Sequence, residues 1–314
     1  MKKTFLSLCL ALISFKAVAN ENDSLAMDSA FIDLLSQLNA YQEFQDSLDN
    51  ALNFEEGTIM LSNDLATLKV PDQLMYLATE QSKQVLTDVW NNPPQESLIG
   101  MMIPKGTSVL NDSTYAILIS FEREGFVDDD DAEDLDYDEL LETMQEDASA
   151  SNAERQRLGY PTIDIIGWAN PPYYDAATKK LHWAKELSFD GDSAHVLNYN
   201  VRILGRRGYL EMNFIGGLYL LDQIKADMPA ILESVEFNDG HRYADFNPDL
   251  DEVAAYGIGG LIAGKVLAKV GFFALILKFW KIIAVGAVGL FAGFRRFFGG
   301  KKKDDDTKDN ADQD

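Results

Sequence analysis

The sequence predicts an α+β domain on a mostly antiparallel sheet with packed helices, followed by a C-terminal transmembrane helical segment. Two observations support this prediction. Runs of alternating apolar and polar residues, separated by turn residues, recur along 54–250, and the segments with helical spacing lie apart from them. The residues after 254 are almost continuously apolar over a length sufficient to cross a bilayer. Strands in succession with segregated helices are typical of this fold class.

The first half of the domain is predicted from local patterns. Apolar residues recur at helical spacing within 20–53, which we interpret as an N-terminal helical segment. Alternation around the turn-prone residues 62–64 predicts a β-hairpin. A helix is expected to begin at the proline at 71 and to continue to about 89, and the paired prolines of 90–94 then require a loop. Residues 114–121 alternate as in a central strand.

The second half is predicted to be richer in strands. Residues 161–189 have the pattern of strand, turn and strand, and 194–214 form the clearest hairpin, with its turn at 205–208. A helix over 218–228 and a short strand over 235–237 complete the domain, which we place at 54–250.

The two ends of the chain have other features. Residues 1–19 are typical of a secretory signal peptide cleaved after Ala19, with an uncleaved anchor as the alternative. The membrane segment is expected at 254–298, with one span at 270–294 favoured over two. Four lysines interrupt the two apolar windows, and a charge at mid-bilayer costs roughly 2.5–3.5 kcal/mol. The basic residues after 294 then place the charged tail, 299–314, in the cytoplasm.

Charge and cysteine content exclude several functions. The chain has 51 acidic and 27 basic residues, and the acidic excess lies before the membrane segment. Such a domain repels phosphate backbones, so we expect no nucleic-acid partner. The single cysteine lies in the signal peptide, which excludes disulfides and zinc–cysteine sites from the remaining chain.

The most acidic stretch, 124–147, raises the question of a metal site. No starting point places Gly sixth and Glu twelfth, so an EF-hand loop is excluded. Asp136 and Glu139 have the spacing of a capping box and predict a helix start. Before them we expect a solvated acidic loop, with a divalent-cation site as the alternative because oxygen clusters suit hard cations. The loop contains Asp128, Asp129, Asp130 and Asp131.

Other candidate residues lie on the predicted strands. Asn198, Asn200 and Arg202 share one face of the hairpin and could line a groove with polar residues of the partner strand, or form the solvated face common in antiparallel sheets. Trp168, which lies beside prolines, could contribute to an aromatic ligand platform or belong to the core. The histidines lack metal-ligand spacing, and no nucleophile-elbow or phosphate-loop motif occurs in its expected context.

Several motifs in a fixed order resemble those of the bacterial membrane-anchored proteins grouped as domain-of-unknown-function family 2167. The resemblance runs from about 57 to the membrane segment and includes "WNNPP", "GFVDDDDA", "GWANPPYYD", "KLHWA", "LNYNVRILGRRG" and "RYADFNPDLDEVAAYG". No activity is assigned to this family, so the resemblance provides no catalytic residues. It implies a secreted domain with a C-terminal anchor. It also implies that some candidates belong to the family pattern: Asp129, Asp130, Trp168, Asn198, Tyr199, Asn200, Arg202 and Arg206.

We therefore expect a non-enzymatic envelope protein of the inner membrane with a periplasmic binding or assembly domain. Its expected partners are membrane lipid, through the C-terminal helix, and another envelope protein. We expect no cofactor. Two alternatives are an envelope enzyme that uses carboxylates with Arg202 or Arg206, and a domain that responds to divalent cations. The candidate interaction site consists of Asp128, Asp129, Asp130, Asp131, Trp168, Asn198, Asn200, Arg202 and Arg206.

Overall fold

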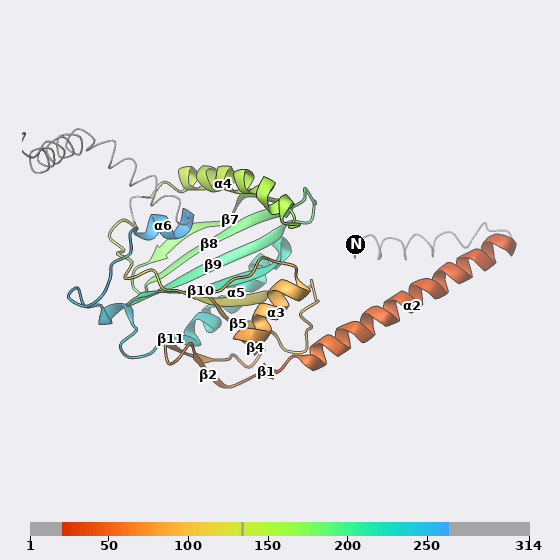
Figure 1. The fold of residues 1–314 in the computed structure, drawn as a ribbon, viewed down its shortest axis with the longest axis horizontal. Helices are drawn as coiled ribbons and strands as arrows, with labels where there is room; N and C mark the ends of the chain where they lie inside the picture. Colours follow the sequence, from red (N-terminus) through yellow and green to blue (C-terminus); the bar gives the residue numbers. More distant parts are fainter. Residues whose placement is uncertain (1–20, 133–134, 264–314) are drawn as a thin grey trace, which may run out of the picture.

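The structure, a computed structural model, describes residues 21–132 and 135–263 (Figure 1). An eight-stranded sheet forms its centre, and every pair of neighbouring strands in it is antiparallel, which confirms the predicted sheet type. In spatial order, the strands are β1 (Phe54–Glu55), β4 (Leu74–Ala78), β5 (Leu98–Pro104), β6 (Ala116–Glu122), β10 (Gly208–Gly217), β9 (Val196–Gly205), β8 (Lys180–Phe189) and β7 (Ile163–Asp175).

A smaller sheet and a helix cover one face of the large sheet. The smaller sheet has the order β11 (Val235–Phe237), β3 (Ala66–Lys69) and β2 (Thr58–Leu61), and β2 and β3 form the hairpin predicted around 62–64. The helix α5 (Leu221–Glu233) follows a short 3-10 turn, η2 (Leu218–Leu220). Their apolar side chains join one face of β6, β9 and β10 in the largest hydrophobic cluster, which includes Tyr199, Val201, Met212, Phe214, Ile224 and Ile231.

The opposite face is covered at its two ends and not in the middle (Figure 1). At one end, α4 (Tyr137–Arg157) and α6 (Ile258–Ala263) cover an apolar cluster that includes Leu181, Trp183 and Tyr209. At the other end, α3 (Thr79–Gln84) and the π-helical turn η1 (Val85–Val89) cover apolar side chains of β4, β5 and β6. Polar side chains of β6, β8, β9 and β10 lie between these two clusters, on the face that carries the candidate residues.

The hairpin of β9 and β10 confirms the predicted turn. Asn200 lies opposite Asn213 and Arg202 opposite Glu211, so these polar side chains share one face. Gly208 has a φ of 142°, and an added Cβ would lie 1.9 Å from the carbonyl oxygen of Glu122. Only glycine fits there, because the turn brings two backbone segments together.

Two helices follow the local signals in the sequence. The helix expected within 20–53 is α2 (Glu21–Ala51), which projects away from the sheet (Figure 1). Asp136 is the N-cap of α4, and its carboxylate accepts hydrogen bonds from the backbone N–H groups of Asp138 (3.0 Å) and Glu139 (3.1 Å). The predicted helix start is therefore confirmed, and its physical basis is the satisfaction of otherwise unpaired amide groups.

The helix predicted for 71–89 is wrong in its first half. Residues 74–78 form β4, which pairs with β1 and β5, and the helical turns α3 and η1 begin only afterwards. The run has buried residues at Leu74, Tyr76 and Leu77, and so short an apolar run does not distinguish strand from helix by its spacing. Pairing with the neighbouring strands then determines the conformation.

Some predictions concern residues that the structure does not describe. The signal peptide, the favoured span at 270–294 and the tail at 299–314 lie outside the described residues. Within 21–132 and 135–263, no helix combines the length and apolar character needed to cross a bilayer.

Candidate functional site

Many of the candidate residues contact one stretch of chain, residues 240–263, which we call the C-terminal segment. This segment contains the 3-10 turn η3 (Tyr243–Asp245) and ends in α6. It lies beside the acidic loop and the β9–β10 turn, and it directly precedes the apolar sequence after 263. The contacts below show how the candidate side chains hold it.

Asp129 is at the centre of a small polar cluster. Its carboxylate accepts hydrogen bonds from the Tyr174 hydroxyl, the Lys179 ammonium and the Tyr243 hydroxyl, each at 2.7 Å. Burial alone would raise the pKa of this carboxyl, but the three donors and the positive charge of Lys179 outweigh it and lower the pKa. Asp129 therefore stays ionised and joins the end of β7 to the C-terminal segment.

The other carboxylates of the acidic loop point to different partners. Asp131 accepts hydrogen bonds from the backbone N–H groups of Ile258 (2.8 Å) and Gly259 (3.4 Å), so it caps the first turn of α6. Asp128 accepts one from the N–H of Asp130 (2.9 Å), which closes an Asx turn within the loop. No group of three or more His, Cys, Asp or Glu side chains that could hold a metal ion is found among the described residues.

Arg202 connects the sheet to α6. Its guanidinium is paired with Glu211 on the neighbouring strand, with Nε and Nη2 each 2.7 Å from Oε2, and both side chains are mostly buried. The guanidinium carbon lies 5.0 Å from the centre of the Trp183 ring and 4.6 Å from that of Tyr209. Nη1 also donates a hydrogen bond to the carbonyl oxygen of Leu261. A planar guanidinium suits this combination of ring stacking and directed hydrogen bonds.

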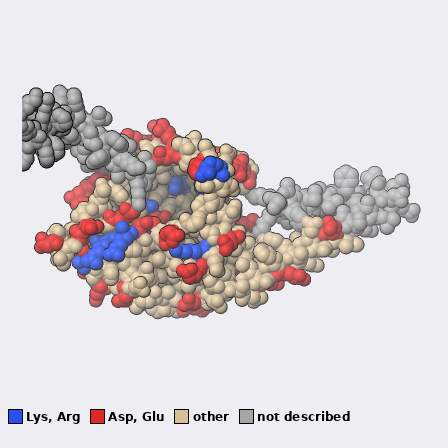
Figure 2. Space-filling model, viewed as in Figure 1, with Lys and Arg blue, Asp and Glu red and all other residues tan. Residues whose placement is uncertain are grey.

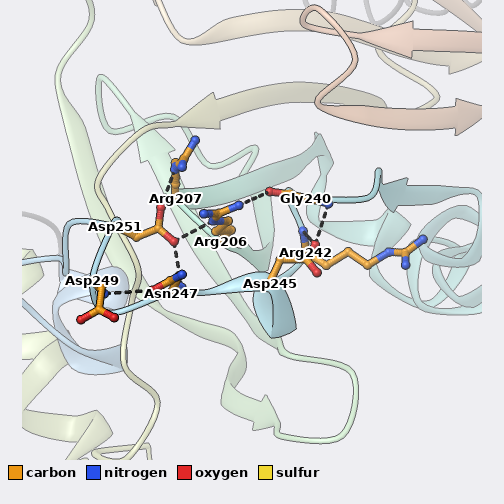
Figure 3. Close-up of polar contacts among 8 residues, drawn as sticks. All are labelled: Arg206, Arg207, Gly240, Arg242, Asp245, Asn247, Asp249 and Asp251. Carbon is orange, nitrogen blue, oxygen red and sulfur yellow. Dashed lines mark hydrogen bonds and ion pairs between the residues drawn. The ribbon is translucent and has the colours of Figure 1, made fainter.

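Arg206 and Arg207, in the β9–β10 turn, hold the middle of the C-terminal segment (Figure 3). Their Nε atoms lie 2.6 Å and 2.7 Å from the two carboxylate oxygens of Asp251, whose side chain has no exposed surface. The same carboxylate accepts the N–H of Asn247 at 2.9 Å, and Arg206 donates to the carbonyl oxygen of Gly240 at 3.2 Å. These donors, led by Arg206, hold the pKa of Asp251 well below its usual range.

The backbone supplies a further connection next to the acidic loop. The N–H of Phe126 donates to the carbonyl oxygen of Glu252, and the N–H of Ala254 donates to that of Phe126, both at 2.8 Å. The rings of Phe126 and Phe246 are stacked with centroids 3.8 Å apart. The C-terminal segment is therefore fixed to the domain along its length by backbone, ionic and aromatic contacts.

The remaining candidates lie elsewhere. Asn200 donates to the side-chain oxygen of Asn198, and Asn198 donates to that of Asn213, both at 2.9 Å, which forms a row of amides across β9 and β10. Trp168 donates its indole N–H to the carbonyl oxygen of Tyr137 at 3.1 Å, and it packs partly buried under α4. The structure therefore divides the predicted site into a cluster at the C-terminal segment and a polar strip on the sheet.

Sequence reasoning did not select several partners of the first cluster. They are Tyr174, Lys179, Tyr243, Asp251 and Leu261. Asp251 and Tyr243 lie within the motif "RYADFNPDLDEVAAYG", so that motif was a signal, but their partners are more than 40 residues away in sequence. The ionised side chains of this cluster are paired with one another. Chemically, they can hold the C-terminal segment to the rest of the domain.

Comparisons with known proteins identify a family and no activity. A family model described as a protein of unknown function (DUF2167) matches residues 53–292. No curated protein sequence matches the chain. Among solved structures, cyanobacterial PsbP (CyanoP) from Synechocystis sp. PCC 6803 is similar over 60% of this chain and 92% of that one, with 8% identity and a TM-score of 0.32.

Proposed function

Because the chain belongs to this family of proteins of unknown function, we propose its function from the geometry of the site. The protein is an anchored envelope protein of the inner membrane. Its α+β domain is a periplasmic binding module, and the C-terminal segment fixes that module to the anchor. The contacts from Asp129, Asp131, Arg202 and Arg206 to residues 240–263 carry the role of the C-terminal segment. The apolar sequence after 263 supports the anchor.

The length of chain between the last fixed residue and the expected span supports the proposal. Arg202 holds the carbonyl of Leu261, and the favoured span begins at residue 270. An extended chain reaches at most about 3.5 Å per residue, so the intervening residues can separate the domain from the bilayer by no more than roughly 30 Å. The domain would therefore work close to the membrane surface and present its outer face to a partner in the envelope.

The geometry of these contacts also fixes the C-terminal segment in one position on the domain. Arg202 holds α6 through a directed hydrogen bond, and Arg206 and Arg207 hold Asp251 through a forked ion pair. Directed ionic contacts specify one arrangement more strictly than apolar contact does, because a small displacement leaves a charge unpaired. This supports a module whose chain leaves the domain at one defined place, a few residues before the expected span.

Fractionation of cells that express the full chain tests the proposal. The full chain should be recovered with the inner membrane and extracted only by detergent, whereas a chain ending at residue 263 should be released with the periplasmic contents. A reporter fused after residue 314 should be active only in the cytoplasm. Recovery of the full chain in the soluble fraction, or a reporter active outside the cytoplasm, would refute the anchoring.

Proteolysis of the full chain tests the role of the C-terminal segment separately. Replacing Asp251 with Ala removes the partner of Arg206 and Arg207, so cleavage within 240–263 should become faster while the central sheet stays intact. Replacing Arg242 with Ala is the matched control, because its ion pairs with Glu236 and Asp239 lie at the surface. Equal cleavage rates in the two variants would show that the ion pair does not hold the segment.

A further inference from the structure

The uncovered middle of the sheet face contains a hollow that the contacts above do not use. Figure 2 shows it between α4 and the region of α3, over the strands β8 to β10 of Figure 1, with Lys or Arg atoms inside it. The strand register places the side chains of Lys185, Asn198, Asn200 and Asn213 on this face. The apolar cluster under α4 and α6 borders it on one side, and the cluster under α3 and η1 borders it on the other.

Lys185 is the unusual residue of this hollow. It lies opposite Asn198 on β9 and opposite Trp168 on β7, and it is partly buried. Among the described residues, its ammonium group has no carboxylate within ion-pair distance: Glu211 is near, but Glu211 is already paired with Arg202. These three charged groups therefore have a net charge of one positive unit, in a protein whose formal net charge is −24.

The environment of Lys185 makes this charge costly. Burial lowers its pKa to about 8, the nearby Glu211 opposes the change, and Arg202 adds to it. A buried ammonium normally has an anionic partner, because its desolvation is otherwise uncompensated. Lys185 therefore has capacity for an anion that the described part of the chain does not supply.

The neighbouring polar groups have unused capacity of the right kind. The amide N–H groups of Asn213 have no acceptor, and the side-chain oxygen of Asn200 has no donor, among the described residues. Donors outnumber acceptors in this set, and buried donors are usually paired. The hollow is therefore suited to an oxygen-rich anion.

We infer that this hollow binds the carboxylate of an organic ligand. The carboxylate forms an ion pair with Lys185, and the adjoining polar part of the ligand hydrogen-bonds to the amide row of Asn198, Asn200 and Asn213. One positive charge in excess matches one carboxylate. A phosphate group fits less well, because the guanidinium of Arg202 is already occupied by Glu211 and Leu261 and the surrounding domain is strongly acidic.

This inference goes beyond the proposed anchoring. The hollow lies within the domain, so carboxylate binding does not depend on how the chain is attached to a membrane. Two kinds of ligand share the chemistry: free organic acids and the carboxyl ends of peptides. The experiment below separates them.

The test is the rate at which an acetylating reagent modifies Lys185 in the purified full chain, followed by mass spectrometry. The probes are benzoate, a short peptide with a free carboxyl end, the same peptide with an amidated end and inorganic phosphate, with chloride at matched ionic strength as the reference. A probe with a Kd of about 10 mM fills about five-sixths of the sites at about 50 mM, so modification should slow about sixfold. Lys69, which is exposed on β3, is the internal control and should react at an unchanged rate.

Each outcome has a defined meaning. Protection by benzoate and the acid peptide supports a free-acid site, and protection by the acid peptide alone supports a site for chain ends. No protection by either carboxylate would overturn the inference, and so would equal protection by the amidated peptide or stronger protection by inorganic phosphate. As a second measurement, carboxylate should raise the melting temperature of the wild type and of Lys69→Met but not of Lys185→Met.

Discussion

Replacing Arg202 with Met tests the ion pair that joins the sheet to α6. The substitution keeps an unbranched side chain between Trp183 and Tyr209, but it leaves the carboxylate of Glu211 and the carbonyl of Leu261 without their donor. Only 15% of the Arg202 side chain and 14% of the Glu211 side chain are exposed, so Glu211 would remain as a largely buried, unpaired charge. Breaking such a pair costs about 3–5 kcal/mol.

This cost converts into a measurable change in melting temperature. In a domain of about 150–250 residues, 1 kcal/mol shifts the melting temperature by about 2–4 °C, so Arg202→Met should lower it by about 6–20 °C. Circular dichroism of the detergent-purified full chain measures this change. Arg242→Met is the matched control and should melt within about 2 °C of the wild type, because it removes two surface ion pairs and one long hydrogen bond, from Nε to the carbonyl oxygen of Phe237 at 3.3 Å.

A double variant distinguishes the effect of the broken ion pair on stability from the effect of lost side-chain packing. Arg202→Met combined with Glu211→Met removes both charges, and replacing a buried pair with apolar side chains is often neutral or stabilising. The double variant should therefore recover most of the stability that the single variant loses. The reasoning would be refuted if Arg202→Met melted like the wild type, or if the double variant were less stable than the single one.

Two further predictions concern pH. The pKa of Asp129 is lowered in the fold, so its stabilising contribution is present above the unfolded pKa and is lost as pH falls through the folded one. Asp129→Asn should therefore flatten the fall in melting temperature on acidification, and an unchanged acid dependence would contradict this. The pKa of Lys185 is lowered from 10.5 to about 8, so the charged form destabilises the fold below pH 8 and this penalty disappears as pH rises toward 10.5. At neutral pH and without ligand, denaturant unfolding should show Lys185→Met to be more stable than the wild type by about 1–3 kcal/mol, because solvent near the partly exposed ammonium screens part of the penalty. This difference in stability should vanish at high pH.

The parts of the fold that could be predicted from sequence are those decided by neighbouring residues. The turn at 205–208 and the cap at Asp136 follow from short-range geometry, and both are present as predicted. Residues 74–78 could not be assigned in this way, because a five-residue apolar run fits a strand or a helix. Its conformation depends on pairing with β5, which follows it by about 20 residues.

The candidate site shows the same limit more strongly. The sequence marked Asp131 and Arg202 as functional candidates, but their partners Ile258 and Leu261 are 127 and 59 residues away. A motif shows that a residue type is used, and it does not show whether the partner is a ligand or another part of the same chain. Lys185 was missed for the opposite reason: a lysine in a strand suggests solvent exposure, and only the folded structure shows that it is partly buried.

The use of charged residues at the C-terminal segment needs a reason other than stability. Apolar side chains at Arg202 and Glu211 would hold the sheet and α6 together about as strongly, since burying an ion pair costs desolvation energy. Apolar contact, however, tolerates sliding, whereas the bond from Arg202 to the carbonyl of Leu261 and the fork of Arg206 and Arg207 on Asp251 are satisfied in one position only. Two such contacts, ten residues apart in the C-terminal segment, define both its position and its direction as it leaves the domain. The proposed anchoring needs the chain to leave the domain at one defined place, and these contacts provide it.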